Sequence, residues 1–231
     1  METETWGGYY RKKMIKFGGA LEYHKRRILE NSTFIEQLSH GSDGGKKIIE
    51  LGMGFGSVLV ELSNLGFNVM GIDNDFGMAH LANDSIKQIG KNNIKITLSD
   101  VRCIGIKDQA FDLSFSHGLM EHFSNEDAQR MIKEALRISN RFIFVVPTEL
   151  ATIPLTRKIL DLSKQFHGDE RYQSIKDWEK IINGADVVIE RKFGYWPIYP
   201  GGKNVHFNFD QAQQMYGDNC LYAGYHIISH L

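Results

Sequence analysis

Short apolar runs alternate with amphipathic stretches through the middle of the chain. The runs have the length and composition of buried strands, and stretches with helical spacing separate most of them. Strands that alternate with helices usually pair side by side in a parallel sheet. The pattern therefore predicts a parallel sheet built from the runs Lys46–Leu51, Phe67–Asp73, Ile94–Asp100, Ala110–Ser116 and Arg141–Pro147.

Two further apolar runs, Asp186–Gly194 and Cys220–Leu231, lie near the end of the chain. No helical pattern long enough to demand a parallel crossover separates them, so they could close the sheet as an antiparallel pair. A chain of 231 residues with 42% hydrophobic content can bury one sizeable core and hardly two. We therefore expect one domain, in which residues 46–147 form the core between an N-terminal helical segment (1–45) and a closing segment (148–231).

Composition and charge exclude several classes of protein. The 27 basic and 28 acidic residues nearly cancel, so net charge draws the chain neither to nucleic acid nor to an anionic membrane. Cys103 and Cys220 are far apart and outside any CxxC pattern, which argues against a disulfide framework or a thiolate zinc site. No run approaches the roughly 20 apolar residues of a membrane span, and a signal-peptide core is absent from the first residues. We expect a soluble, cytoplasmic protein.

A glycine-rich turn follows the first predicted strand. In the segment IIELGMGFGSV, Glu50 ends the strand, and Gly52, Gly54 and Gly56 lead into a stretch with helical spacing that stops at Gly66. Glycine permits positive φ angles and the close approach of a ligand to the backbone. The turn has two possible uses, as a tight connection between strand and helix or as a ligand-binding loop.

Two acidic residues at later strand ends favour the ligand-binding loop. Asp73 ends the next strand about 20 residues after the glycines, where a carboxylate can accept both hydroxyls of a nucleoside ribose. Asp100 ends a third strand and would reach the same edge of a parallel sheet, where it could meet an adenine amino group. The spacing predicts a nucleoside-containing ligand.

A dinucleotide such as NAD is disfavoured by two residues of the turn. Ser57 stands where the dinucleotide fingerprint requires its last glycine. The negative charge of Glu50 would oppose a pyrophosphate but favour an ammonium group. The Gly-Lys-Ser/Thr ending of a P-loop is absent as well. An NAD-dependent oxidoreductase is therefore the weakest of the functions considered.

Four segments together resemble successive motifs of the class I S-adenosylmethionine-dependent methyltransferases. These are ELGMGFG, GIDNDFGM, LSDV and FDLSFSHGLMEHF, within roughly Lys46–Pro147. The resemblance implies a Rossmann-like α/β fold, with helices on both faces of a seven-stranded sheet that is mostly parallel and has an antiparallel C-terminal strand. It also implies S-adenosyl-L-methionine as the cofactor.

The same resemblance implies where the cofactor would bind. The methionine part would lie against the glycine turn and the backbone after the fourth strand, the ribose at Asp73, and the adenine beside Asn74 and the following acidic position. The implied cofactor-binding residues are Glu50, Gly52, Gly54, Gly56, Asp73, Asn74, Asp100, Val101, Ser116 and His117.

Aromatic and basic residues are interleaved in the first 40 residues. The segment is either an amphipathic helix packed on the sheet with a solvated basic face, or a lid over the cofactor that also contacts the substrate. Tyr9 and Tyr10 are candidate lid residues, with Tyr10 assigned to cofactor binding, and Arg11 could neutralise the cofactor carboxylate. The basic patch is modest and partly balanced by acidic residues, so we expect no nucleic-acid partner.

The segment after Pro147 is expected to cover the sheet edge near the reaction centre with helices. Ser174 is a plausible helix cap, and Trp178 is most simply a core residue. The aromatic loop around residues 195–209 suits either a substrate pocket or the contact of a homodimer, and the sequence leaves both open.

The stretch FSHGLMEHF, Phe115–Phe123, crowds polar residues after the fourth predicted strand. A metal site is disfavoured, because the His-x-x-Glu-His spacing is not met and because His117 and His122 would lie about 140° apart on a helix. Candidate proton acceptors are His117, Glu121 and His122, with His24, His167 and His206 elsewhere in the chain.

Motifs of DNA-methylating enzymes are absent, and the Glu-His pair resembles a version found in many enzymes of small metabolites or lipid-like acceptors. We therefore predict methyl transfer to an O or N atom of a small-molecule acceptor, with His122 and Glu121 as catalytic residues and no metal. A non-catalytic S-adenosylmethionine-binding module is the alternative.

Overall fold

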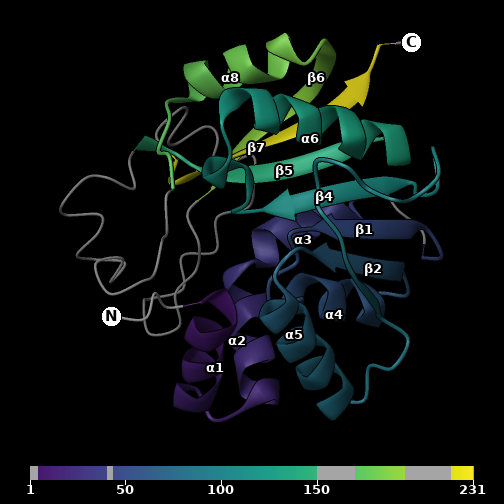
Figure 1. Ribbon diagram of the computed structural model, residues 1–231, viewed down its shortest axis with the longest axis vertical. Helices are drawn as coiled ribbons and strands as arrows, with labels where there is room; N and C mark the ends of the chain where they lie inside the picture. Colours follow the sequence, from purple (N-terminus) through teal and green to yellow (C-terminus); the bar gives the residue numbers. More distant parts are fainter. Residues whose placement is uncertain (1–4, 41–43, 150–169, 196–219, 231) are drawn as a thin grey trace.

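Seven strands form one sheet in the computed structural model, which describes residues 5–40, 44–149, 170–195 and 220–230 (Figure 1). From one edge to the other, the strand order is β3-β2-β1-β4-β5-β7-β6. The strands are β1 (Lys47–Leu51), β2 (Asn68–Asp73), β3 (Lys95–Leu98), β4 (Leu113–His117), β5 (Phe142–Pro147), β6 (Val187–Tyr195) and β7 (Tyr222–Ser229).

The pairing confirms the predicted fold class. Strands β1 to β5 pair in parallel, whereas β7 runs antiparallel to both of its neighbours, β5 and β6. Each strand lies within a run predicted from the sequence or extends one residue beyond it, as β4 does at His117 and β6 does at Tyr195. The strand β3 is shorter than its run because it lies at the sheet edge, where Thr97 and Leu98 remain exposed and little burial extends the pairing.

Helices cover both faces of the sheet. Alternate residues of β1 point to opposite faces, so that Ile48 packs in a cluster with α3, α4 and α5, and Ile49 packs in a cluster with α6 and α8. The helices are α1 (Trp6–Lys16), α2 (Ala20–Glu30), α3 (Ser32–Ser39), α4 (Ser57–Asn64), α5 (Phe76–Gln88), α6 (Asn125–Ile138) and α8 (Ile175–Gly184), with a 3-10 turn η1 (Met120–His122). Within the described residues, no helix has the length and apolar character needed to cross a bilayer.

The helix α8 confirms two expectations about the closing segment. The Ser174 hydroxyl accepts a hydrogen bond from the Asp177 backbone N–H at 3.2 Å and so caps the helix. Trp178 is fully buried in the cluster between α6, α8 and the sheet. The aromatic loop predicted around residues 195–209 lies almost entirely outside the described residues.

The N-terminal helices α1 and α2 pack beside α4 and α5 (Figure 1). The imidazole of His24 on α2 joins these helices, because its two nitrogens hydrogen-bond the hydroxyls of Ser57 (2.9 Å) and Ser85 (3.3 Å). Burial lowers the pKa of His24 to about 4, so the ring is neutral at pH 7. His24 therefore holds the helices together and is not placed to take a proton from a substrate.

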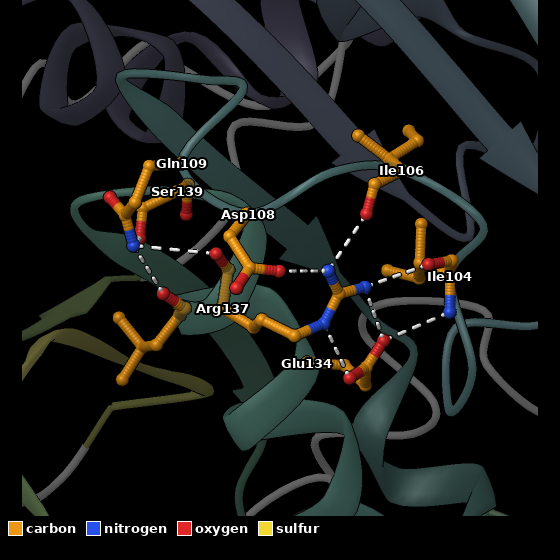
Figure 2. A network of polar contacts seen from close by, with 8 residues as sticks. Ile104, Ile106, Asp108, Gln109, Glu134, Arg137 and Ser139 are labelled. Atoms are coloured by element: carbon orange, nitrogen blue, oxygen red, sulfur yellow. Dashed lines mark hydrogen bonds and ion pairs between the residues drawn. The ribbon is translucent and has the colours of Figure 1, made fainter.

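A network around Arg137 of α6 fixes the loop between β3 and β4 (Figure 2). The guanidinium donates to the carbonyls of Ile104 and Ile106 at 2.7 Å each and to the carboxylates of Asp108 and Glu134. Glu134 in turn accepts from the Ile104 backbone N–H at 3.0 Å. Since this loop begins with Asp100 and Val101, the network also fixes one side of the predicted adenine site.

Replacing Arg137 by methionine should lower the free energy of unfolding by about 2 to 3 kcal/mol, measured by urea denaturation. The change removes several charge-assisted hydrogen bonds and leaves two loop carbonyls without their donor. Arg137→Lys should recover little, because an ammonium group cannot reproduce the fork of the guanidinium. The control is Arg130→Met on the same helix, where an exposed side chain makes one ion pair at 3.5 Å. Equal stability of the two methionine variants would contradict this account.

A candidate active site at the carboxyl edge of the sheet

The glycine turn lies between β1 and α4, where β2 and β4 flank β1 on its two sides. The chain changes direction across the sheet at this point, and such switch points leave a crevice at the carboxyl ends of the strands. Gly52, Gly54 and Gly56 all have left-handed φ angles, of +65°, +52° and +71°. The structure thus confirms the conformation that the sequence predicts for the turn.

The surroundings of the turn require glycine at position 52 and leave space at position 54. A Cβ at Gly52 would lie 2.6 Å from a methyl group of Leu119, so η1 packs directly against the turn. A Cβ at Gly54 would meet only the Tyr10 hydroxyl, at 4.0 Å. A ligand can therefore approach the backbone of Gly54 beneath Tyr10.

Asp73 is held against the turn by backbone donors. Its two carboxylate oxygens accept hydrogen bonds from the N–H groups of Gly54 and Asp75, both at 3.0 Å. Burial raises the pKa of Asp73, and these backbone donors oppose the rise. Its neighbour Asn74 is exposed, while Asp75 caps α5 by accepting from Met78 N–H at 2.8 Å. Asp73 is thus oriented at the carboxyl end of β2 beside the glycine turn, and its contact with a ribose stays a prediction.

Glu50 is a buried carboxylate with an unused oxygen. The side chain is only 4% exposed, and its Oε2 atom has no hydrogen-bond partner among the described residues. Burial raises the pKa of Glu50 well above its usual range, the carboxylate of Asp73 adds to this rise, and the guanidinium of Arg27 opposes it. A buried acceptor in this state is suited to a cationic ligand.

Arg27 of α2 is a site residue that the sequence prediction missed. Its guanidinium donates to Glu30 at 2.7 Å and lies close enough to lower the pKa of both Glu50 and His117, although burial is the larger influence on each. Arg11, which was predicted to neutralise a ligand carboxylate, is exposed. The signal for Arg27 was the spacing of Tyr23, Arg27 and Glu30 along one face of the helix.

The helix α1 crosses from the glycine turn to η1. The ring of Tyr10 is parallel to that of Phe55 in the turn, with centroids 6.4 Å apart, and Trp6 meets His122 edge to face at 5.6 Å. This position agrees with the expectation of a lid over the site. The roles of Tyr9 and Tyr10 toward a ligand stay predictions.

Asp100 and Val101 have neighbours that the predicted adenine contact did not take into account. Asp100 is paired with Arg102, whose Nη2 lies 2.7 Å from its carboxylate and which also reaches Asp127. Val101 is buried and belongs to the cluster that contains Ile72 of β2. For Asp100 to accept from an adenine amino group, the carboxylate would have to be shared with Arg102, and sequence spacing gave no sign of that competitor.

Ser116 and His117 end β4 beside the turn. Ser116 is fully buried, and its hydroxyl has no partner among the described residues. The His117 ring lies near Phe34 (5.2 Å) and Tyr222 (5.4 Å). Burial, assisted by Arg27, lowers the pKa of His117 to about 3, so it is a poor proton acceptor. The sequence predicts that the backbone of these two residues contacts the methionine part of the cofactor, and that contact stays a prediction.

Glu121 and His122 meet Glu170, a residue that the sequence analysis did not single out. One ligand atom from each of the three lies within 4.8 Å of those of the other two. The rings of His117 and His122 have different aromatic neighbours, Phe34 and Trp6 respectively. Of the other candidate histidines, His24 is structural, and His167 and His206 lie outside the described residues.

Comparison with known proteins identifies this arrangement. Residues 48–141 match a family model described as a methyltransferase domain. Residues 48–141 thus have the sequence pattern of a methyltransferase domain. The matched range contains the glycine turn, Asp73, Asp100 and the Glu121–His122 pair, but neither Arg27 nor Glu170. Arg27 lies before this range, on α2, and Glu170 lies after it, beyond β5.

Solved structures of methyltransferases share the fold. Magnesium protoporphyrin IX methyltransferase from Synechocystis PCC 6803, with bound SAH, aligns over 96% of this chain and 94% of its own, with a TM-score of 0.64 and 16% identity. A SAM-dependent methyltransferase from Aquifex aeolicus aligns over 95% and 98% (TM-score 0.61, 15% identity). A chain of the complex that contains the Haloferax volcanii Trm112 methyltransferase activator aligns over 98% and 99% (TM-score 0.69, 12% identity). No curated protein sequence matches the chain.

Replacing Glu50 by glutamine should stabilise the ligand-free methyltransferase domain by about 1 to 3 kcal/mol at pH 7, measured by urea denaturation. Because the folded-state pKa of Glu50 is raised, the stability of the wild-type chain falls as pH rises above about 4.5, where the unfolded chain ionises this carboxyl group. The difference between the two proteins should therefore vanish near pH 4.

The matched control is Glu22→Gln on α2, where the carboxylate is exposed and paired only with Lys25. That variant should change stability by no more than about 0.5 kcal/mol. A Glu50→Gln protein that is less stable than the wild type at pH 7 would show that the carboxylate has a stabilising partner.

Proposed function

We propose that the chain transfers the methyl group of S-adenosylmethionine to an O or N atom of a small-molecule acceptor. The single observation that carries the proposal is the unpartnered, buried carboxylate oxygen of Glu50 beside the open backbone of Gly54. A carboxylate there suits the ammonium group of a methionine moiety and opposes a pyrophosphate. The match of residues 48–141 to a methyltransferase domain supports the same cofactor.

The residues present fit such a cofactor. Asp73, already oriented by two backbone donors, would accept from the ribose hydroxyls, and Glu50 would accept from the ammonium group. The positive charge of Arg27 would neutralise the carboxylate of the cofactor. The sequence predicted this role for Arg11, which is exposed. When bound, the cofactor supplies a sulfonium-activated methyl group, so the protein mainly orients the acceptor and excludes water. Positioning of this kind is worth several kcal/mol, on the order of 7 to 11 in well-oriented cases.

The acceptor would lie where α1, η1 and Glu170 meet. Trp6 and Tyr10 supply aromatic surface there, while His122, Glu121 and Glu170 supply groups that can accept a proton. Histidine is the side chain that most often takes a proton near neutral pH. This mixture of aromatic and acidic groups favours a small polar acceptor over a nucleic acid, whose phosphates the carboxylates would repel.

Ligand binding separates the proposal from an NAD-dependent oxidoreductase. S-adenosylmethionine and S-adenosylhomocysteine, each at about 100 times its dissociation constant, should stabilise the protein by roughly 2.7 kcal/mol in thermal unfolding, and NAD should not. Asp73→Ala should weaken S-adenosylmethionine binding about 100-fold in calorimetry, because it removes an ionised acceptor and frees the Gly54 N–H. Gly54→Arg should abolish binding by filling the space beneath Tyr10.

The matched control for Asp73→Ala is Asp84→Ala, which removes an exposed carboxylate of α5 paired with His80. Stabilisation by NAD alone would overturn the proposal. Turnover then separates an enzyme from a binding module. Incubation with a metabolite extract should give a product heavier by one methyl group in the wild type and in Asp84→Ala, and none in Asp73→Ala. Binding without any such product would favour the module.

A further inference from the structure

The group formed by Glu121, His122 and Glu170 contains a buried carboxylate oxygen that nothing in the described part of the chain satisfies. Glu121 is only 2% exposed, and its Oε2 atom has no hydrogen-bond partner there. Its carboxylate faces a second carboxylate and an imidazole nitrogen within 4.8 Å. Two carboxylates at this separation, one of them buried, can both be ionised only if a positive charge lies between them.

The spacing of the three side chains is close to that of ligands around one ion. Metal bonds to histidine nitrogen and carboxylate oxygen are about 2.0 to 2.2 Å long, so two ligand atoms of a tetrahedral site are about 3.3 to 3.6 Å apart. The observed limit of 4.8 Å exceeds this by about 1.2 to 1.5 Å. Rotation of the side chains alone can close such a gap.

Hydrogen bonds from residues next to Glu170 hold the parts of this group together. The Arg171 N–H donates to the Glu121 carbonyl at 2.9 Å, which ties the segment of Glu170 to η1. The Tyr172 hydroxyl donates a short hydrogen bond to Glu170. A hydroxyl or carboxylate that orients a ligand in this way is usual around protein metal sites.

We propose that Glu121, His122 and Glu170 bind one divalent first-row cation, such as Zn²⁺, Mn²⁺ or Fe²⁺, at the acceptor side of the methyl-transfer site. The imidazole nitrogen favours these ions over Mg²⁺ and Ca²⁺, which prefer sites made of oxygen alone. Three protein ligands leave at least one coordination position open, as in catalytic rather than structural metal sites.

The role of the cation rests on the proposed methyl transfer, and in it Glu121 and His122 act as ligands of the cation in place of accepting the proton of the substrate. An acceptor hydroxyl bound at the open position would release its proton to water more readily, because the cation stabilises the resulting oxyanion. The oxygen electron pair then forms the bond to the methyl carbon while the carbon–sulfur bond breaks and its electron pair stays on sulfur, which leaves S-adenosylhomocysteine. The cation keeps its oxidation state. The inferred substrate class is therefore an acceptor with a metal-binding hydroxyl.

Cobalt(II) titration of the full-length, chelator-treated protein tests the site without reference to activity. Visible absorption should saturate at one Co²⁺ per chain, and Zn²⁺ should compete more strongly than Mg²⁺. Glu121→Gln, His122→Ala and Glu170→Gln should each weaken Co²⁺ binding by more than about 100-fold. Even the loss of a residue that only hydrogen-bonds to a metal ligand lowers metal affinity about 10- to 100-fold. The controls Glu22→Gln and His80→Ala remove exposed groups and should bind Co²⁺ as the wild type does.

Calorimetry with S-adenosylmethionine on the same metal-free samples checks folding and separates the two proposals. The three variants should bind the cofactor within about threefold of the wild type. Absence of saturable Co²⁺ binding, or unchanged Co²⁺ affinity in all three variants, would overturn the metal site while cofactor binding upheld the methyltransferase. Co²⁺ binding that depends on the three residues, in a protein that binds no S-adenosylmethionine, would support the metal site and overturn the proposed function.

Discussion

The hydrogen bond from the Gly54 N–H to the carboxylate of Asp73 joins the two strand ends on which the site is built. It forms because the turn after β1 holds three left-handed glycines at alternate positions, 52, 54 and 56, a backbone path that side chains with a Cβ would strain. The same path exposes the peptide groups of the turn at the switch point between β1 and β4. The position and the orientation of the site therefore depend on the left-handed backbone of these three glycines.

The buried carboxyl groups of the site lower the stability of the folded chain. Glu50 and Glu121 are both buried, each with an oxygen that no described residue satisfies, and burial raises the pKa of each. Arg27 offsets part of this on the side of the glycine turn. Unsatisfied buried polar groups are rare in folded proteins and concentrate where a ligand completes them. The two glutamates thus belong to the two groups of residues to which we assign, as proposals, the cofactor and the acceptor.

The N-terminal helices contribute both packing and chemistry. His24 fixes α2 to α4 and α5 through two hydroxyl groups, and α2 then presents Arg27 toward the glycine turn. On α1, Trp6 and Tyr10 reach His122 and Phe55. The sequence analysis left open whether this segment packs on the fold or covers the site. The contacts show that the pair packs on α4 and α5, and the use of the segment as a lid stays a prediction.

Much of the fold was predictable because its signals are local. A buried parallel strand is a short apolar run, and a turn with left-handed angles needs glycine, so the seven strands, the glycine turn and Asp73 could all be placed from neighbouring residues alone. The cap at Ser174 and the burial of Trp178 follow from helical spacing in the same way.

What the sequence alone determined is thus the strands of the sheet, their mostly parallel pairing and the identity of the residues around the turn. Only the tertiary structure decided that Glu170 joins Glu121 and His122, that Arg27 rather than Arg11 approaches Glu50, and that Arg102 competes for Asp100. The physical reason is the same for the first two. Glu170 and Arg27 reach the site through the packing of whole elements far apart in the chain, so that helical spacing could place Arg27 on one face of α2 but not beside the glycine turn. Arg102 is close in sequence, but its pairing depends on the direction of a flexible side chain that Asp127 also attracts.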